Sequence, residues 1–294
     1  MLELAFIRPV NRLPRRRFAL HAAFGIAAAS TGACSITPAR PTGPTVVLVH
    51  GAWYGGWCWS KLVPLLADAG CDVHTPTLTG LGDRAHLAGG SDRNERGALH
   101  VTLETHVHDI QALLRTSDLR DVVLVGHSYG GMVISQVAER ERSRIRQLVF
   151  LDAFVPESGK RVVDYLLPLE RREAIVKVGT QTGFVPPIPA QALGVTDAAD
   201  RAWMDARAVK QPFGTFAEPA RLTAEAGAGL LRTYIACVEP ASGSFGQFAQ
   251  KLKHRPDWNY DELRTGHNAM VTAPASLAAS LLATMRVGTQ PATT

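Results

Sequence analysis

A serine between two glycines is the strongest chemical signal in this sequence. It lies in Gly126-His127-Ser128-Tyr129-Gly130, after the apolar, β-branched run 121–125 and before the helical pattern of 132–139. This succession is typical of a nucleophile elbow, in which the glycines leave room for strand and helix and a strained turn exposes the serine Oγ. We therefore predict that Ser128 is an acyl-transfer nucleophile and that the backbone N–H of Tyr129 faces the attacked carbonyl oxygen.

A serine hydroxyl is a poor nucleophile at neutral pH, so Ser128 needs a base, and the base needs an orienting acid. The candidate base is His267, which comes directly after the last predicted strand. His50 and His127 instead flank glycine turns, where a histidine usually supports packing or the loop.

A second group of histidines superficially resembles a metal-binding motif. His106, His108 and Asp109 follow one another closely in a predicted helix. Their spacing differs from the known H-x-H-x-D pattern, and residues two apart on a helix do not face one ligand. We therefore predict no metal site.

The cysteines give no sign of a zinc or redox centre, because no two of them form a C-x-x-C pair. Cys34 belongs to the basic leader described below. Cys237 lies in an apolar strand pattern and Cys58 in an aromatic cluster, which favours buried free thiols. A Cys58–Cys71 disulfide is the alternative.

Buried strands and helices alternate along most of the chain. This order favours an α/β fold with a mostly parallel sheet of about six strands and helices on both faces. The predicted core comprises residues 45–155 and 226–288. Its strands are expected at 45–49, 72–75, 122–125, 148–151, 233–236 and 258–263, with helices at 62–69, 103–115 and 132–139.

Residues 156–225 break this alternation, with scattered prolines and short helical pieces. Because the segment lies between two strands, we expect a cap over the carboxyl ends of the strands, where open α/β sheets bind ligands. Aromatic side chains of such a cap either line an apolar pocket or form the small core of the cap itself. The residues expected in the substrate pocket are Trp53, Phe154, Phe184, Trp203, Phe213, Phe216 and Met270.

The positive charge of the chain is concentrated at its N-terminus. Residues 1–34 contain five arginines and one glutamate, which account for +4 of the formal net charge of +5. The remainder is about neutral and has no basic stripe interleaved with aromatics, so we predict no nucleic-acid partner.

Residues 1–34 have the order of an export signal. The basic Arg15-Arg16-Arg17 precedes the apolar stretch 18–29 and the small residues 30–33, and paired arginines suit the twin-arginine route. The apolar stretch is too short and too weakly apolar for a transmembrane span. We expect an exported protein, periplasmic or secreted. Residues 35–44 form a proline-rich linker, after which the folded domain begins. A lipid anchor on Cys34 and a frayed cytosolic N-terminus are the alternatives.

Three motifs together resemble the α/β-hydrolase superfamily. They are the elbow, the run Val49-His50-Gly51-Ala52-Trp53-Tyr54-Gly55-Gly56-Trp57-Cys58-Trp59, and the late Gly266-His267. The resemblance covers about residues 45–285. It is to the plant methylesterase and hydroxynitrile-lyase branch and to bacterial carboxylesterases of the same build.

The resemblance implies a serine esterase that forms an acyl-enzyme on Ser128 and needs neither a metal nor an organic cofactor. It also implies that the Ala52 N–H joins the Tyr129 N–H as an oxyanion donor. In the lyases of this branch, a threonine follows the first-loop histidine and a lysine follows the catalytic histidine. Here those positions hold Gly51 and Asn268, which oppose cyanohydrin chemistry.

The acid of the catalytic set departs from the family pattern. The family acid follows the strand before the histidine, but Val238-Glu239-Pro240 places a proline at that position. Glu239 is one residue early, whereas Asp152 ends the predicted strand 148–151. We favour Asp152, because a strand terminus fixes the direction of a side chain better than a turn does. Glu239 remains the alternative.

The expected function is therefore a serine carboxylesterase that acts on a small-molecule ester. Aromatic residues in the cap favour small to medium apolar or aryl esters. A hydroxynitrile lyase and a non-catalytic ligand receptor of the same fold are the alternatives.

Overall fold

The computed structural model describes residues 43–88, 101–241 and 243–287, which all belong to the compact unit Arg40–Thr294. The predicted export signal at residues 1–34 lies outside the described residues. In the described part, no helix is both long and apolar enough to cross a membrane.

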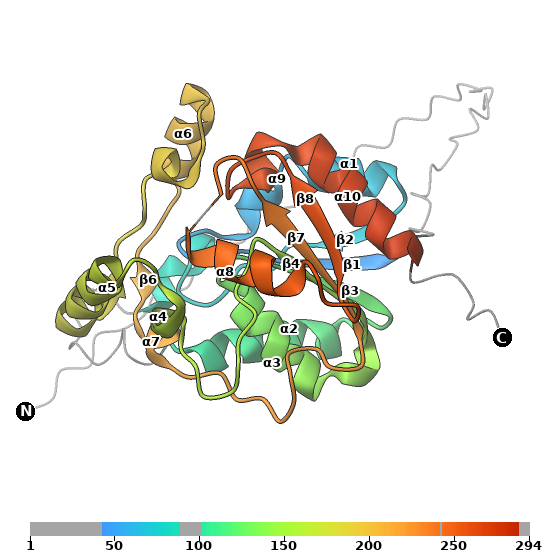
Figure 1. The fold of residues 1–294 in the computed structure, drawn as a ribbon, viewed down its shortest axis with the longest axis horizontal. Helices are drawn as coiled ribbons and strands as arrows, with labels where there is room; N and C mark the ends of the chain where they lie inside the picture. The colour runs from blue at the N-terminus through green and yellow to red at the C-terminus, as the bar shows by residue number, and fades with distance from the viewer. Residues whose placement is uncertain (1–42, 89–100, 242, 288–294) are drawn as a thin grey trace, which may run out of the picture. The chain divides into compact units, whose positions relative to one another are not determined.

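A parallel six-stranded sheet in the order β2-β1-β3-β4-β7-β8 forms the centre of the fold (Figure 1). Every residue of β3 is buried, as expected for an apolar strand covered on both faces. The predicted sheet is confirmed, with small shifts at the strand ends. The strands are β1 (Thr45–Val49), β2 (Asp72–His74), β3 (Val122–His127), β4 (Ile145–Leu151), β7 (Leu231–Cys237) and β8 (Asn259–Leu263).

Helices cover both faces of this sheet (Figure 1). α1 (Val63–Asp68) packs with α10 (Pro274–Val287) on one face, and α2 (Leu103–Thr116) packs with α3 (Gly130–Arg140) on the other. α8 (Gly243–Leu252) contacts β7. Shorter helices are α9 (Ala269–Thr272), η1 (Gly56–Trp59), η2 (Gly82–Ala88) and η4 (Arg142–Arg144).

Between β4 and β7 the chain leaves the sheet, as the interrupted pattern of 156–225 predicts. The segment contains short helices and one small antiparallel ladder, in which β5 pairs with β6. Figure 1 shows α5 and α6 standing away from the sheet. The elements are α4 (Val162–Tyr165), α5 (Leu169–Thr182), β5 (Phe184–Val185), η5 (Ala190–Leu193), α6 (Ala198–Asp205), β6 (Gln211–Pro212) and α7 (Gly214–Ala217).

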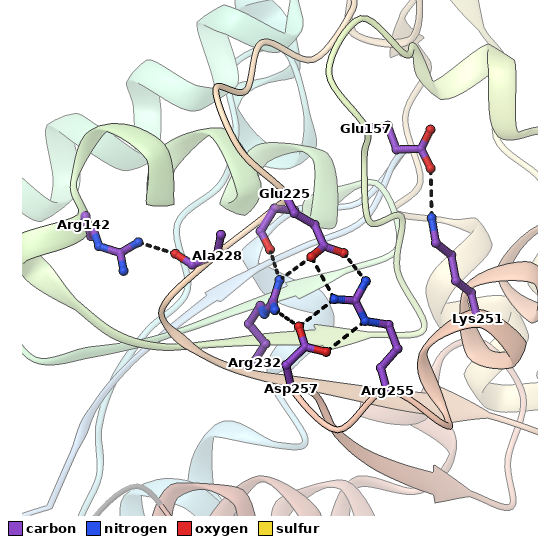
Figure 2. A network of polar contacts seen from close by, with 9 residues as sticks. Arg142, Glu157, Glu225, Ala228, Arg232, Lys251, Arg255 and Asp257 are labelled. Atoms are coloured by element: carbon purple, nitrogen blue, oxygen red, sulfur yellow. Dashed lines mark hydrogen bonds and ion pairs between the residues drawn. The ribbon is translucent and has the colours of Figure 1, made fainter.

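A network of arginines and carboxylates secures the return of the chain into the sheet (Figure 2). Arg232, near the start of β7, is paired with Glu225 and Asp257, and its guanidinium lies 4.7 Å from the ring centre of Trp258. Arg255 donates to the same carboxylates, at 2.6 Å to Glu225 and 2.9 Å to Asp257. The network therefore ties the loop before β7 to the turn before β8, at the amino ends of these strands.

The three cysteines of the described residues, Cys58, Cys71 and Cys237, are free and buried. The alternative of a Cys58–Cys71 disulfide is therefore not realised. Burial raises the pKa of the Cys58 thiol well above its ordinary value. Cys58 thus behaves as a small apolar core residue.

Candidate active site

The serine of the elbow sits in a strained turn between β3 and α3. Ser128 has φ of 55°, in the left-handed region that costs a non-glycine residue free energy. Hydrogen bonds hold the turn: the Ser128 N–H donates to the Leu151 carbonyl at 3.2 Å, and the Ser128 carbonyl accepts from Gly131 and Phe154, each at 3.1 Å. The elements around the elbow thus maintain the strain.

The glycines beside Ser128 lie so close to neighbouring backbone atoms that a side chain would not fit. A Cβ on Gly126 would lie 2.8 Å from the carbonyl of Gly130, and one on Gly130 would lie 2.7 Å from the Val49 oxygen. A Cβ on Gly131 would meet the Phe154 oxygen at 2.1 Å. The glycine spacing seen in the sequence therefore allows β3, α3 and β1 to pack at this distance.

Asp152 and His267 form a buried hydrogen-bonded pair. The Asp152 Oδ2 lies 2.6 Å from His267 Nδ1, and both side chains are buried. Asp152 follows β4, where its N–H donates to the Ile235 carbonyl at 2.7 Å and its Oδ1 accepts from the Cys237 N–H at 3.4 Å. Both bonds reach β7, so this strand holds the backbone of Asp152 and one carboxylate oxygen, and the other oxygen is directed at the imidazole.

Glu239, the alternative acid, lies apart from this pair. Its side chain is exposed, and its backbone N–H donates to the Thr265 carbonyl at 3.1 Å. Among the described residues, no hydrogen bond or ion pair joins it to His267. The structure thus brings Asp152, and not Glu239, to the histidine.

Two further rings contact the imidazole of His267. Phe245 of α8 stacks on it, with ring centres 4.5 Å apart and planes 10° from parallel. His127 lies with its ring centre also 4.5 Å away, and its Nε2 donates to the His267 carbonyl at 2.9 Å. Burial and the neighbouring His267 hold the pKa of His127 well below its ordinary value. A neutral His127 therefore supports the backbone of His267.

The backbone N–H groups of Ala52 and Tyr129 are the predicted oxyanion donors. Neither has a hydrogen-bond partner among the described residues. Tyr129 precedes α3, where the first N–H groups of a helix have no intrahelical acceptor. A Cβ on Gly51 would lie 2.9 Å from the Ser128 Cβ, so the loop that carries Ala52 runs against the elbow.

Two buried histidines near the site have structural partners. His50 donates from Nδ1 to the Gly51 carbonyl at 2.8 Å and accepts the Leu78 N–H at Nε2. His106 donates from Nε2 to the Thr79 carbonyl at 2.8 Å and accepts the Tyr129 hydroxyl at Nδ1. Burial lowers the pKa of each to about 4.

No cluster of histidine, cysteine or acidic residues suited to a metal ion occurs in residues 43–88, 101–241 and 243–287. His106 is bonded as described above. Asp109 accepts hydrogen bonds from the Thr79 backbone and hydroxyl. His106 and Asp109 thus fix the loop around Thr79, whereas the exposed His108 pairs with Glu104 on the same helix.

A cavity of about 530 Å³ contains the Ser128 and His267 side chains in its wall. Ala52 and Tyr129 also line it, so Ser128, His267 and the two residues predicted to supply oxyanion donors all border one cavity. Phe245 is a further wall residue. Sequence reasoning missed Phe245, because only the fold brings α8 beside His267.

The structure places three of the predicted pocket residues, Trp53, Phe154 and Phe216, at this cavity. Trp53 also joins core and cap, because its Nε1 donates to the Val185 carbonyl at 3.2 Å. The cavity wall includes further apolar residues of the cap, for which the sequence shows no signal beyond hydrophobicity. They are Val162, Leu166, Ile175, Ile188 and Leu193.

The other predicted pocket residues pack elsewhere, and this part of the prediction needs correction. Trp203 packs edge-on against Trp57, with ring centres 4.9 Å apart. Phe213 fills the space beside Gly179 of α5, and Phe184 belongs to β5. Met270 is fully buried in α9. Trp203, Phe213 and Met270 pack against other core residues, the alternative that aromatic content alone leaves open, whereas Phe184 is only half-buried.

Comparison with known proteins agrees with this architecture. A family model described as the alpha/beta hydrolase family matches residues 46–280. A carbendazim hydrolyzing esterase from Nocardioides sp. (strain SG-4G) is 40% identical over 246 residues, which cover 81% of this chain and 98% of that protein. Salicylic acid-binding protein 2 of Nicotiana tabacum is 37% identical over 116 residues, or 40% of this chain and 42% of that protein.

A solved structure shares the fold over nearly its whole length. An extracellular alpha/beta-hydrolase from a Paenibacillus species matches with a TM-score of 0.70 and 24% identity, covering 82% of this chain and 99% of that one. The chain belongs to the alpha/beta hydrolase family. Within that family, its relatives support an enzyme that hydrolyses carboxylic esters.

Proposed function

We propose that this protein is a serine carboxylesterase that hydrolyses small to medium apolar or aryl esters. The observation that carries the proposal is the buried Asp152–His267 pair at 2.6 Å, in a chain whose elbow serine lines the same cavity as that histidine. A strained nucleophile, a base and an orienting acid are the parts that acyl transfer requires.

In the proposed mechanism, Ser128 Oγ attacks the ester carbonyl while His267 Nε2 accepts the hydroxyl proton. Asp152 keeps the other imidazole nitrogen protonated and stabilises the imidazolium that forms. The Ala52 and Tyr129 N–H groups donate to the oxyanion of the tetrahedral intermediate. His267 then returns the proton to the leaving alcohol, and a water molecule activated by the same histidine releases the acid from Ser128.

The cavity supports the proposed substrate class. Its wall consists mainly of aromatic and aliphatic side chains, including Trp53, Phe154 and Phe216, and about 530 Å³ is in the range of pockets for small molecules. The 40% identical relative is named for carbendazim hydrolysis, which makes carbendazim a second probe to include.

Two residues favour an esterase over a hydroxynitrile lyase, although an alpha-hydroxynitrile lyase of Arabidopsis thaliana is 38% identical over 112 residues, or 38% of this chain and 40% of that protein. Gly51 leaves no room for the side chain that the lyases have there, because an added Cβ would lie 2.9 Å from His127 Nδ1. Asn268 is fully buried and carries no charge.

The proposal is tested with a panel of p-nitrophenyl and naphthyl esters of increasing acyl length, together with carbendazim and mandelonitrile. We expect turnover of the esters with a burst of alcohol release when deacylation limits the rate. Cleavage of mandelonitrile without ester hydrolysis supports the lyase instead. Binding of the esters without any turnover supports the ligand receptor.

We further propose that the enzyme is exported. The support is the basic, apolar and small-residue order of residues 1–34. Mass spectrometry of cell fractions is expected to find a mature chain that begins near Ser35 in the periplasm or the medium. Recovery of the full-length chain in the cytoplasm alone contradicts this proposal.

A further inference from the structure

One charged side chain lines the otherwise apolar substrate cavity. Arg171 lies in the first turn of α5, in the cap, and forms part of the same wall as Ser128 and His267. Within the described residues, it is the sole lysine, arginine, aspartate or glutamate that lines this cavity.

The guanidinium of Arg171 has no protein partner in the described part of the chain. The next residue, Arg172, donates to the Val163 carbonyl at 2.6 Å and to the Asp164 carbonyl. Arg171 has neither a side-chain hydrogen bond nor an ion pair, and burial alone lowers the pKa of its guanidinium, with no neighbouring carboxylate to raise it. A guanidinium in this position has five N–H donors to offer to a ligand.

The surroundings of Arg171 strengthen its attraction for an anion. Val162, Leu166, Ile175 and Ile188 line the cavity with it, and all are aliphatic. Charges attract one another more strongly beside such groups than in open water. A partly desolvated arginine without a partner is costly in the free enzyme, and a bound carboxylate removes that cost.

We propose that Arg171 binds a carboxylate of the substrate, so that the preferred substrates are esters that carry a second, unesterified carboxyl group. This inference rests on the proposed esterase function of the same cavity. The ester group of such a half-ester reaches Ser128 from the core side of the cavity, while the free carboxylate pairs with the guanidinium on the cap side. The planar guanidinium matches the two oxygens of a carboxylate, which a lysine in its place does not.

The test compares ethyl half-esters of linear dicarboxylic acids with ethyl alkanoates of the same chain length. We expect the wild-type enzyme to prefer a half-ester of one optimal length. Arg171→Met is expected to lower the ratio of kcat/KM for half-ester to kcat/KM for alkanoate by about 10- to 100-fold, the usual effect of one charge-assisted hydrogen-bonded pair. Arg171→Lys is expected to restore part of that ratio.

Lys177→Met is the matched control, because Lys177 lies exposed on the same helix outside the cavity. It removes an equal charge from α5, and we expect it to leave the ratio unchanged. A ratio that is the same in wild type and in Arg171→Met overturns the inference. An equal fall in the Lys177→Met variant also overturns it, because the effect is then general attraction to a positive surface.

Binding measurements separate this inference from the proposed function. Calorimetry with the Ser128→Ala variant needs no turnover. We expect this variant to bind the half-ester at least about 10-fold more tightly than the double variant Ser128→Ala/Arg171→Met does. Equal affinities overturn the carboxylate site even if the wild type hydrolyses esters. An affinity difference without any hydrolysis by the wild type supports the site and contradicts the esterase mechanism.

Discussion

Asp152→Asn is the change that bears most directly on how His267 is activated. The two oxygens of Asp152 have different partners: Oδ2 faces His267 Nδ1 at 2.6 Å, and Oδ1 accepts from the Cys237 N–H at 3.4 Å. An asparagine that keeps the bond to Cys237 through Oδ1 must direct its NH₂ group at His267. That group donates a hydrogen bond, so Nδ1 becomes the acceptor and the proton moves to Nε2. A protonated Nε2 cannot accept the proton of Ser128.

The size of the effect follows from the burial of the pair. Both side chains are almost fully shielded from water, at 6% exposure for His267 and 3% for Asp152. The amide leaves the imidazolium that forms during proton transfer without its carboxylate, and the loss of one partner from a buried charged pair costs about 3 to 5 kcal/mol. With about 1.4 kcal/mol for each factor of ten in rate, kcat is expected to fall by about 10²- to 10⁴-fold, with little change in KM.

Stopped-flow and steady-state hydrolysis of p-nitrophenyl butyrate measure this loss. Glu239→Gln is the matched control, because Glu239 is exposed and has no hydrogen bond or ion pair to His267 in the described part of the chain. We expect its kcat to stay within about 2-fold of the wild type, as is usual for surface substitutions. If Glu239→Gln loses most of the activity and Asp152→Asn keeps it, the reasoning from strand ends to the catalytic acid is refuted.

Three further predictions concern the turn, the acid stability and the return into the sheet. Gly130→Ala places a methyl group 2.7 Å from the Val49 oxygen, and we expect urea unfolding to show a loss of about 1 to 3 kcal/mol in the free energy of unfolding; an unchanged midpoint contradicts the tight packing. His50 and His106 have pKa values of about 4 in the folded protein, so from pH 6.5 down to about 4 the unfolded chain binds protons that the folded protein does not. The free energy of unfolding is expected to fall by up to about 1.4 kcal/mol per pH unit for each of them, and a flat profile across this window rules out the neutral buried forms. Arg232→Met removes the single guanidinium that pairs with Glu225 and Asp257, and thermal unfolding is expected to show a loss of about 1 to 2 kcal/mol in the free energy of unfolding with kcat/KM unchanged; a changed kcat/KM is evidence against a purely structural role.

The elbow could be read from the sequence because its geometry restricts residue type at fixed spacing. Gly126, Gly130 and Gly131 each face a backbone oxygen or carbonyl within a distance that excludes a Cβ, and such positions tolerate few residues other than glycine. The buried strands were equally readable, since strands covered on both faces need continuous apolar runs. The predicted mostly parallel sheet of about six strands agrees with the six-stranded sheet observed, whereas its strand order was not predicted.

The pocket was predicted less well, because its shape depends on how short helices of the cap pack. Phe213 and Trp203 are as aromatic as Phe216, but they pack against Gly179 and Trp57 and only Phe216 reaches the cavity. Nothing in the spacing of these residues distinguishes the two outcomes. Arg171 was missed for the same reason, since Arg172 follows it directly in α5 and nothing in the sequence shows which of the two lines the cavity.

Asp152 was identified as the favoured acid from its place after a strand, and the structure brings it to His267. The family pattern pointed to the turn after β7, where Glu239 is exposed. The decisive information is the direction of the side chain, which is fixed by two bonds to β7: the Asp152 N–H donates to the Ile235 carbonyl, and the carboxylate accepts the Cys237 N–H. A sequence shows which residues end a strand, but it does not show these cross-strand bonds.

Labelling of the nucleophile is the most direct measurement of the central claim, that Ser128 carries the acyl group. The wild-type protein is treated with a fluorophosphonate probe, and the labelled peptide is identified by mass spectrometry beside the Ser128→Ala and Ser135→Ala variants. Ser135 is the matched control, because it is buried in α3 and its hydroxyl donates to the Gly131 carbonyl at 2.7 Å. We predict one label per chain on Ser128, and its loss in Ser128→Ala together with a fall in esterase kcat of about 10³-fold or more. A label on another residue, or a Ser128→Ala variant that keeps its activity, contradicts the account.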